Sequence, residues 1–198
     1  MIYLIILSVL GAGITLYLYM TGRLVDEPIE PLEVLPEAPE LPVEPVLPPK
    51  APTMTNREKL YDTAYNSRGK DMSPLDKAPD KLACMESLDG VYFAAFGEHL
   101  LKPEDRLSTQ RGYASMIKDP RLALIPNADA LPGDMVISPT GSSTKGAPHG
   151  HCGVRGKTAY MSNDSNTGLW IANYNLPNWE LVFKKTLGFP VFHFRVKD

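Results

Sequence analysis

The stretch KLACMESLDGVYFAAF, residues 81–96, is the helix around which the rest of this 198-residue chain can be arranged. Its apolar residues recur at helical spacing and would bury one face; they are Leu82, Leu88, Val91, Tyr92 and Ala95. Gly97 follows them as a plausible C-cap. Cys84 falls in the first turn, where the partial positive charge of a helix N-terminus stabilises a thiolate.

The segments on either side of this helix predict an α+β domain over residues 55–198. Further helices are expected at residues 56–66 and at 108–117, the second with Ser108 as its N-cap. Strands are expected at 134–138, 151–155, 158–163 and 189–196, the middle two forming a hairpin around Gly156-Lys157. Helices come first and strands follow, so we expect helices packed on one side of an antiparallel sheet.

Residues 1–22 are expected to form one transmembrane helix. The chain has no charged side chain before Arg23, and about 20 apolar residues are enough to cross a bilayer. A cleaved signal peptide is the competing interpretation, but it would carry a basic segment and a shorter apolar core. Arg23 weakly favours a cytoplasmic location for the residues that follow. A domain that acts on the cell wall would have to lie on the other side of the membrane.

Residues 23–54 are expected to form an extended acidic linker. Nine prolines lie between Pro28 and Pro52, and seven acidic residues between Asp26 and Glu44. A polyproline II spacer of this length would reach on the order of 80 Å. A proline-motif ligand for a partner protein is the alternative. The net charge is −3 with no clustered basic face, which argues against nucleic-acid binding.

Cys84 and His151 are the candidate catalytic pair. His151 opens a predicted strand, and a histidine can take a thiol's proton and later protonate a leaving amine. Strand alternation places Cys152 on the opposite face, pointing away from the site. We therefore expect two free thiols, with Cys84 much the more reactive. His149 is a rival base, although Pro148 makes it a loop residue.

Asn163 is the candidate third residue. If the hairpin loop has three residues, His151 pairs with Asn163, which could hold the imidazole in its productive tautomer. With a two-residue loop, the partner is Ser162 instead. Cysteine, histidine and asparagine then follow one another as in papain-type sites.

Three segments resemble the NlpC-type cell-wall cysteine peptidases and the related CHAP amidases. ACMESLDGVYFAAFG (83–97) is similar to their nucleophile helix, LPGDMVIS (131–138) to their "PGD" strand and HGHCGV (149–154) to their histidine strand. Residues 160–180 resemble a divergent branch associated with phages or mobile elements. The third residue is often histidine in the NlpC-type enzymes and is asparagine here, which leaves peptidase and amidase open.

The resemblance implies a papain-like fold and a hydrolase that cleaves amide bonds in peptidoglycan without a metal or cofactor. The protein would be a single-pass membrane protein whose domain faces the cell wall, or a component of a virion membrane, with a role such as phage lysis. Trp170, Tyr174 and Trp179 would line a substrate groove or belong to the core. The alternatives are a non-catalytic envelope or virion protein and a zinc site built from Cys84, His149, His151 and Cys152.

Overall fold

The computed structural model describes residues 8–10, 13–15, 53–73 and 83–198, and the chain divides into two units, Met1–Pro49 and Lys50–Asp198. In the first unit, β1 (Ser8–Leu10) pairs antiparallel with β2 (Gly13–Thr15). The six described residues of the predicted anchor lie in these two strands and not in a helix, and the rest of the anchor and nearly all of the predicted linker lie outside the described residues. Among the helices of the described segments, none combines the length and the apolar character needed to cross a bilayer.

The three predicted helices of the second unit are confirmed. They are α1 (Asn56–Asn66), α2 (Cys84–Phe96) and α3 (Thr109–Met116), with a 3₁₀ turn, η2 (Pro103–Leu107), between the last two. Thr55 and Glu58 form a reciprocal capping box that starts α1. Gly97 ends α2 in the left-handed conformation, with a φ of 75° that favours glycine, and Ser108 caps α3.

The sheet has six antiparallel strands in the order β3-β8-β4-β5-β6-β7. Their bounds are β3 (Leu122–Ile125), β4 (Met135–Ser138), β5 (His151–Arg155), β6 (Ala159–Asn163), β7 (Trp170–Asn175) and β8 (Phe192–Val196). The α+β class and the hairpin β5–β6 were expected from the sequence, whereas β3 and β7, the two edge strands, were not. A short 3₁₀ turn, η3 (Asn127–Asp129), follows β3.

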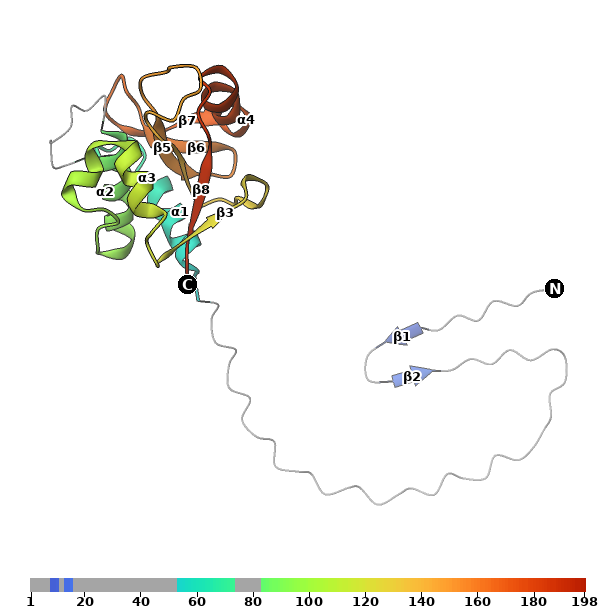
Figure 1. Cartoon of the computed structure of the whole chain (residues 1–198). Coiled ribbons are helices and arrows are strands. Elements are labelled where there is room, and N and C mark those ends of the chain that lie inside the picture. The colour runs from blue at the N-terminus through green and yellow to red at the C-terminus, as the bar shows by residue number, and fades with distance from the viewer. Residues whose placement is uncertain (1–7, 11–12, 16–52, 74–82) are drawn as a thin grey trace, which may run out of the picture. The chain divides into compact units, whose positions relative to one another are not determined.

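The two faces of the sheet pack into two hydrophobic clusters. The first face carries Ile137, Cys152 and Val154 and packs against α1, α2 and α3 (Figure 1). The second face carries Val136 and Tyr160 and is covered by α4 (Leu176–Trp179) and the π-helical segment η4 (Glu180–Thr186). The sheet is therefore covered on both faces, by the predicted helices on one and by a C-terminal helical segment on the other.

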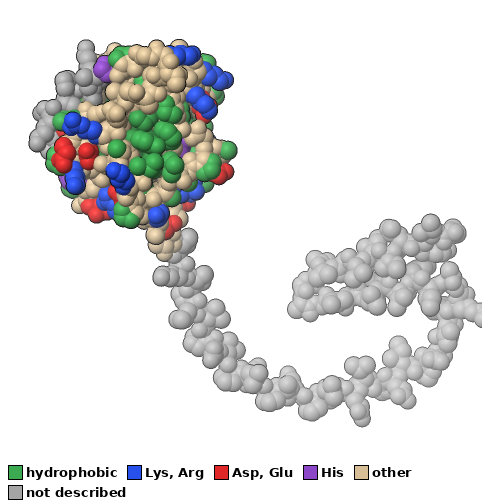
Figure 2. Space-filling view, viewed as in Figure 1, with side chains coloured by type: hydrophobic (Ala, Val, Ile, Leu, Met, Phe, Trp, Pro, Cys, Tyr) green, Lys and Arg blue, Asp and Glu red, His purple; other side chains and the backbone are tan. Residues whose placement is uncertain are grey.

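The two ends of this unit meet at the start of α1. The backbone N–H of Asn56 donates to Asp198 Oδ1 at 2.7 Å, and its side-chain amide donates to the carbonyl oxygen of Lys197 at 2.6 Å. On the face of the unit seen in Figure 2, hydrophobic side chains gather near the middle while positive and negative side chains are interspersed around them.

Candidate active site

Cys84 is the first residue of α2 and is partly exposed. The helix starts here because Leu88, Val91 and Tyr92 follow at the spacing that buries one face against the sheet. Ala83, the N-cap residue, makes no side-chain capping bond, so the first-turn N–H groups are not capped by that residue. One of them, that of Met85, donates a hydrogen bond to the Cys84 sulfur.

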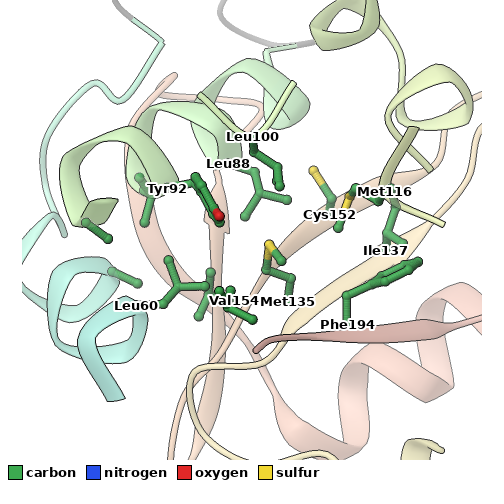
Figure 3. Close-up of a cluster of buried hydrophobic side chains, with 14 of the residues drawn as sticks. Leu60, Leu88, Tyr92, Leu100, Met116, Met135, Ile137, Cys152, Val154 and Phe194 are labelled. Carbon is green, nitrogen blue, oxygen red and sulfur yellow. The ribbon is translucent and has the colours of Figure 1, made fainter. Parts of the chain in front are cut away.

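Cys152 lies beside Cys84, so the prediction that Cys152 points away from the site is wrong. Its side chain is fully buried on the face of β5 that packs against α2, among Leu88, Met116 and Ile137 (Figure 3). Its thiol makes a hydrogen bond with the Cys84 sulfur. His151 and Cys152 do point to opposite faces of β5, but α2 packs over the face of Cys152 and not over the opposite one.

The two thiols therefore differ strongly in acidity. The hydrogen bond from Cys152, together with the hydrogen bond and charge of His151 and the Met85 N–H, holds the pKa of Cys84 well below its usual value in spite of burial. Burial, followed by the hydrogen bond with Cys84 and its charge, raises the pKa of Cys152 well above the usual value. Cys84 is thus the more acidic thiol of the pair and Cys152 the less acidic one.

His151 is the first residue of β5, at the end of the strand nearest to Cys84, and its ring makes a hydrogen bond with the thiol. Aromatic rings fix its orientation. Trp179 stacks at a centroid distance of 5.5 Å, Phe183 stacks at 5.7 Å, and Tyr174 presents its edge at 5.8 Å. His151 is partly exposed, as Cys84 is.

The residue that holds the other side of the imidazole is Ser162. Its hydroxyl lies 2.9 Å from His151 Nε2, which leaves Nδ1 as the nitrogen for the Cys84 thiol. Ser162 is fully buried and is held in turn by Asn173, whose Oδ1 accepts the hydroxyl proton at 2.6 Å.

Asn163 does not make the contact that was predicted for it. The hairpin pairs Val154 with Met161 and Arg155 with Tyr160, so neither expected register, His151 with Asn163 or with Ser162, is correct. Alternation along β6 places the buried Asn163 on the face of Cys152 and Ser162 on the other face. The observed pairing leaves residues 156–159 between the paired residues of the two strands, one residue more than the longer expected loop, and the Gly156 N–H donates to the Ala159 carbonyl across this turn.

The remaining sequence candidates occupy other positions. His149 is exposed on the loop before β5. Trp170 and Trp179 are fully buried, the first in the cluster under α1 with its indole N–H donating to the carbonyl of Ala64, so they are core aromatics. In the segments that the structure describes, no group of three or more His, Cys, Asp or Glu side chains is placed to hold a metal ion.

Sequence reasoning missed Asn173 and Phe183 and had Ser162 only as an alternative. Asn173 and Phe183 lie in β7 and η4, elements whose sequences carry no clear period, so no local pattern marks them. No protein-family model matches the chain, and the searches of curated proteins and of solved structures found no match either. The assignment of function therefore depends on the site itself and on the resemblance of its motifs.

Proposed function

We propose that this protein is a membrane-anchored cysteine hydrolase of the papain-like class that cleaves amide bonds in peptidoglycan. The observation that carries the proposal is the contact of the Cys84 thiol, at the N-terminus of α2, with a histidine whose far nitrogen is held by Ser162. A low-pKa thiol beside an oriented imidazole is the arrangement that acyl transfer through a cysteine requires.

In the proposed reaction, the Cys84 thiolate attacks the amide carbonyl carbon, and the proton from the thiol resides on His151 Nδ1. The N–H groups at the start of α2, including that of Cys84, stabilise the oxyanion of the tetrahedral intermediate. Its collapse breaks the C–N bond, and the His151 proton goes to the leaving amine. Water, deprotonated by His151, then hydrolyses the thioester and restores the thiol.

The substrate class rests on the resemblance of residues 83–97, 131–138 and 149–154 to cell-wall peptidases and amidases. An anchor at residues 1–22 and an extended linker would hold such a domain near a bilayer while allowing it to reach the wall. We therefore place the domain on the wall side of the membrane, or in a virion membrane.

The test is hydrolysis of purified peptidoglycan by the full-length protein in detergent, with the new amino groups counted and the products identified by mass spectrometry. Cys84→Ser and His151→Ala should each reduce the rate on the order of 10³-fold or more, because the nucleophile and the base act as one unit. His149→Ala is the matched control, since it removes a nearby exposed histidine, and it should keep the wild-type rate.

An inactive wild-type protein with a free Cys84 would contradict the proposal, as would full activity in Cys84→Ser. Loss of activity in His149→Ala but not in His151→Ala would mean that the base is assigned to the wrong histidine.

A further inference from the structure

The edge strand β7 contains a bulge at Asn173. Met161 of β6 pairs with Ala172, while Tyr160 pairs with Tyr174, so Asn173 is an extra residue with no partner of its own in the ladder. In a regular strand, two consecutive side chains point to opposite faces. Here both Asn173 and Tyr174 reach the surroundings of His151, the first through Ser162 and the second through its ring. Bulges redirect side chains in this way and are frequent beside active sites.

The bond between Asn173 and Ser162 sets the direction of the next hydrogen bond. A serine hydroxyl has one proton, and here that proton is donated to the Asn173 carbonyl oxygen. Towards His151, the Ser162 oxygen can then only accept. A neutral imidazole that donates from Nε2 carries no proton on Nδ1. Nδ1 is the nitrogen left for the Cys84 thiol, and in this tautomer it is able to take the thiol's proton.

We propose that Asn173 is a positioning residue that, through the Ser162 hydroxyl, holds His151 in the Nε2–H tautomer and keeps Nδ1 free to accept the proton of Cys84. The inference rests on the proposed hydrolase function. Ser162 and Asn173, the second placed by the bulge, would thus orient His151, which the sequence analysis expected of Asn163.

The hydrogen bonds from His151 to Ser162 and from Ser162 to Asn173 also stabilise the protonated imidazole. When Nδ1 takes the thiol's proton, Nε2 keeps its own and continues to donate to Ser162. The serine proton stays on the side of Asn173, so no hydroxyl has to rotate during the proton transfer. A hydrogen bond that is already oriented towards the developing charge lowers the reorganisation that the reaction requires.

The experiment compares Asn173→Ala, Asn173→Asp and Ser162→Ala in the full-length protein. The ¹⁵N shifts of the histidine rings report the tautomer of His151, whose signals are identified by their absence in His151→Ala. Asn173→Ala should populate the Nδ1–H tautomer and lower kcat for peptidoglycan about 10- to 100-fold with little change in KM, as is typical of residues that orient a catalytic group. Ser162→Ala should do the same. Asn178→Ala, an exposed asparagine of α4, is the matched control and should change neither quantity.

Asn173→Asp is the conservative variant, because a carboxylate oxygen still accepts the Ser162 proton at the same place. It should restore the Nε2–H tautomer and recover most of the lost rate. A wild-type tautomer in Asn173→Ala would overturn the inference, and so would an Asn173→Asp variant as impaired as Asn173→Ala. The ring shifts need no substrate, so the expected tautomer change in a protein that does not cleave peptidoglycan would refute the proposed function and support the relay.

Discussion

The acidity of Cys84 depends on a residue that does not belong to any catalytic pattern. The hydrogen bond from Cys152 is the largest of the interactions that lower the Cys84 pKa, ahead of those with His151. β5 thus carries His151 and, one residue later and on its other face, the second thiol. Because the helix start lies close to the end of β5, Cys84 is within reach of both.

Replacing Cys152 by alanine should raise the pKa of Cys84, since the main stabilising bond of the thiolate is lost. The thiolate is the form that reacts, so the pH at which alkylation by iodoacetamide reaches half its maximal rate should move upwards, and the rate at pH 7 should fall several-fold. Mass mapping of a time course measures this for each cysteine. Cys152→Ser keeps a hydrogen-bond donor and should lie closer to the wild type.

In the wild type, Cys84 should still be labelled much faster than Cys152, which is fully buried and has a raised pKa. An alkylation profile that does not move in Cys152→Ala would show that His151 and the Met85 N–H set the acidity of Cys84 by themselves.

At the scale of the elements, local sequence signals were sufficient to predict the helices and the β5–β6 hairpin. The bounds of α1 and the caps at Gly97 and Ser108 follow from residues that are close in sequence, and the predicted hairpin is β5–β6. The register of that hairpin was not predictable, because it depends on how the backbone closes the turn over residues 156–159, and no residue type in that turn specifies this. The edge strands carry weak patterns, and the bulge in β7 exists only as a relation between two strands. The sequence named Cys84 and His151 as candidates and Ser162 as an alternative, whereas the contact of Asn173 could be found only from the strand pairing.

Gly153 allows β5 and β6 to come close beside the site. A Cβ atom there would lie 2.3 Å from the carbonyl oxygen of Met161 and 2.9 Å from the Cβ of Ser162. Gly153→Ala should therefore push β6 away, weaken the contact between Ser162 and His151, and cost about 1–3 kcal/mol of unfolding free energy. Urea unfolding and the peptidoglycan assay measure the two effects.

Gly112→Ala is the comparison for this substitution, because the nearest atoms to its added Cβ would belong to the Met85 side chain and not to the backbone. A loss of stability in Gly153→Ala no larger than that in Gly112→Ala would mean that the hairpin yields without strain.

For the whole molecule, the second face of the sheet is as important as the face that carries the predicted helices. Its cluster surrounds His193, a buried histidine whose ring contacts the Tyr160 hydroxyl at 3.0 Å and Asn127 Oδ1 at 2.9 Å. Burial, assisted by the positive charge of Arg155 and opposed by Asp134, lowers the pKa of His193 to about 4. This histidine is therefore neutral in the folded protein over most of the acidic range.

The domain should lose stability as the pH falls from about 6.5 to about 4. In this window the unfolded chain takes up a proton on His193 and the folded protein does not, so protonation favours unfolding, by up to about 3 kcal/mol at the lower end. Denaturant unfolding at a series of pH values measures the slope. His193→Gln should be less stable at pH 7 but should lose less on acidification, and equal slopes for the two proteins would contradict the assignment.

The contact between Asn56 and residues 197–198 brings the beginning and the end of the folded unit together. Its two ends leave from one place (Figure 1), at the start of α1. A short peptide could join them, and new ends could be opened at the exposed Gly146, where an added Cβ would have no neighbour within 4 Å. Because these two ends are neighbours, the whole unit could be inserted into a surface loop of another protein without separating the two sides of that loop.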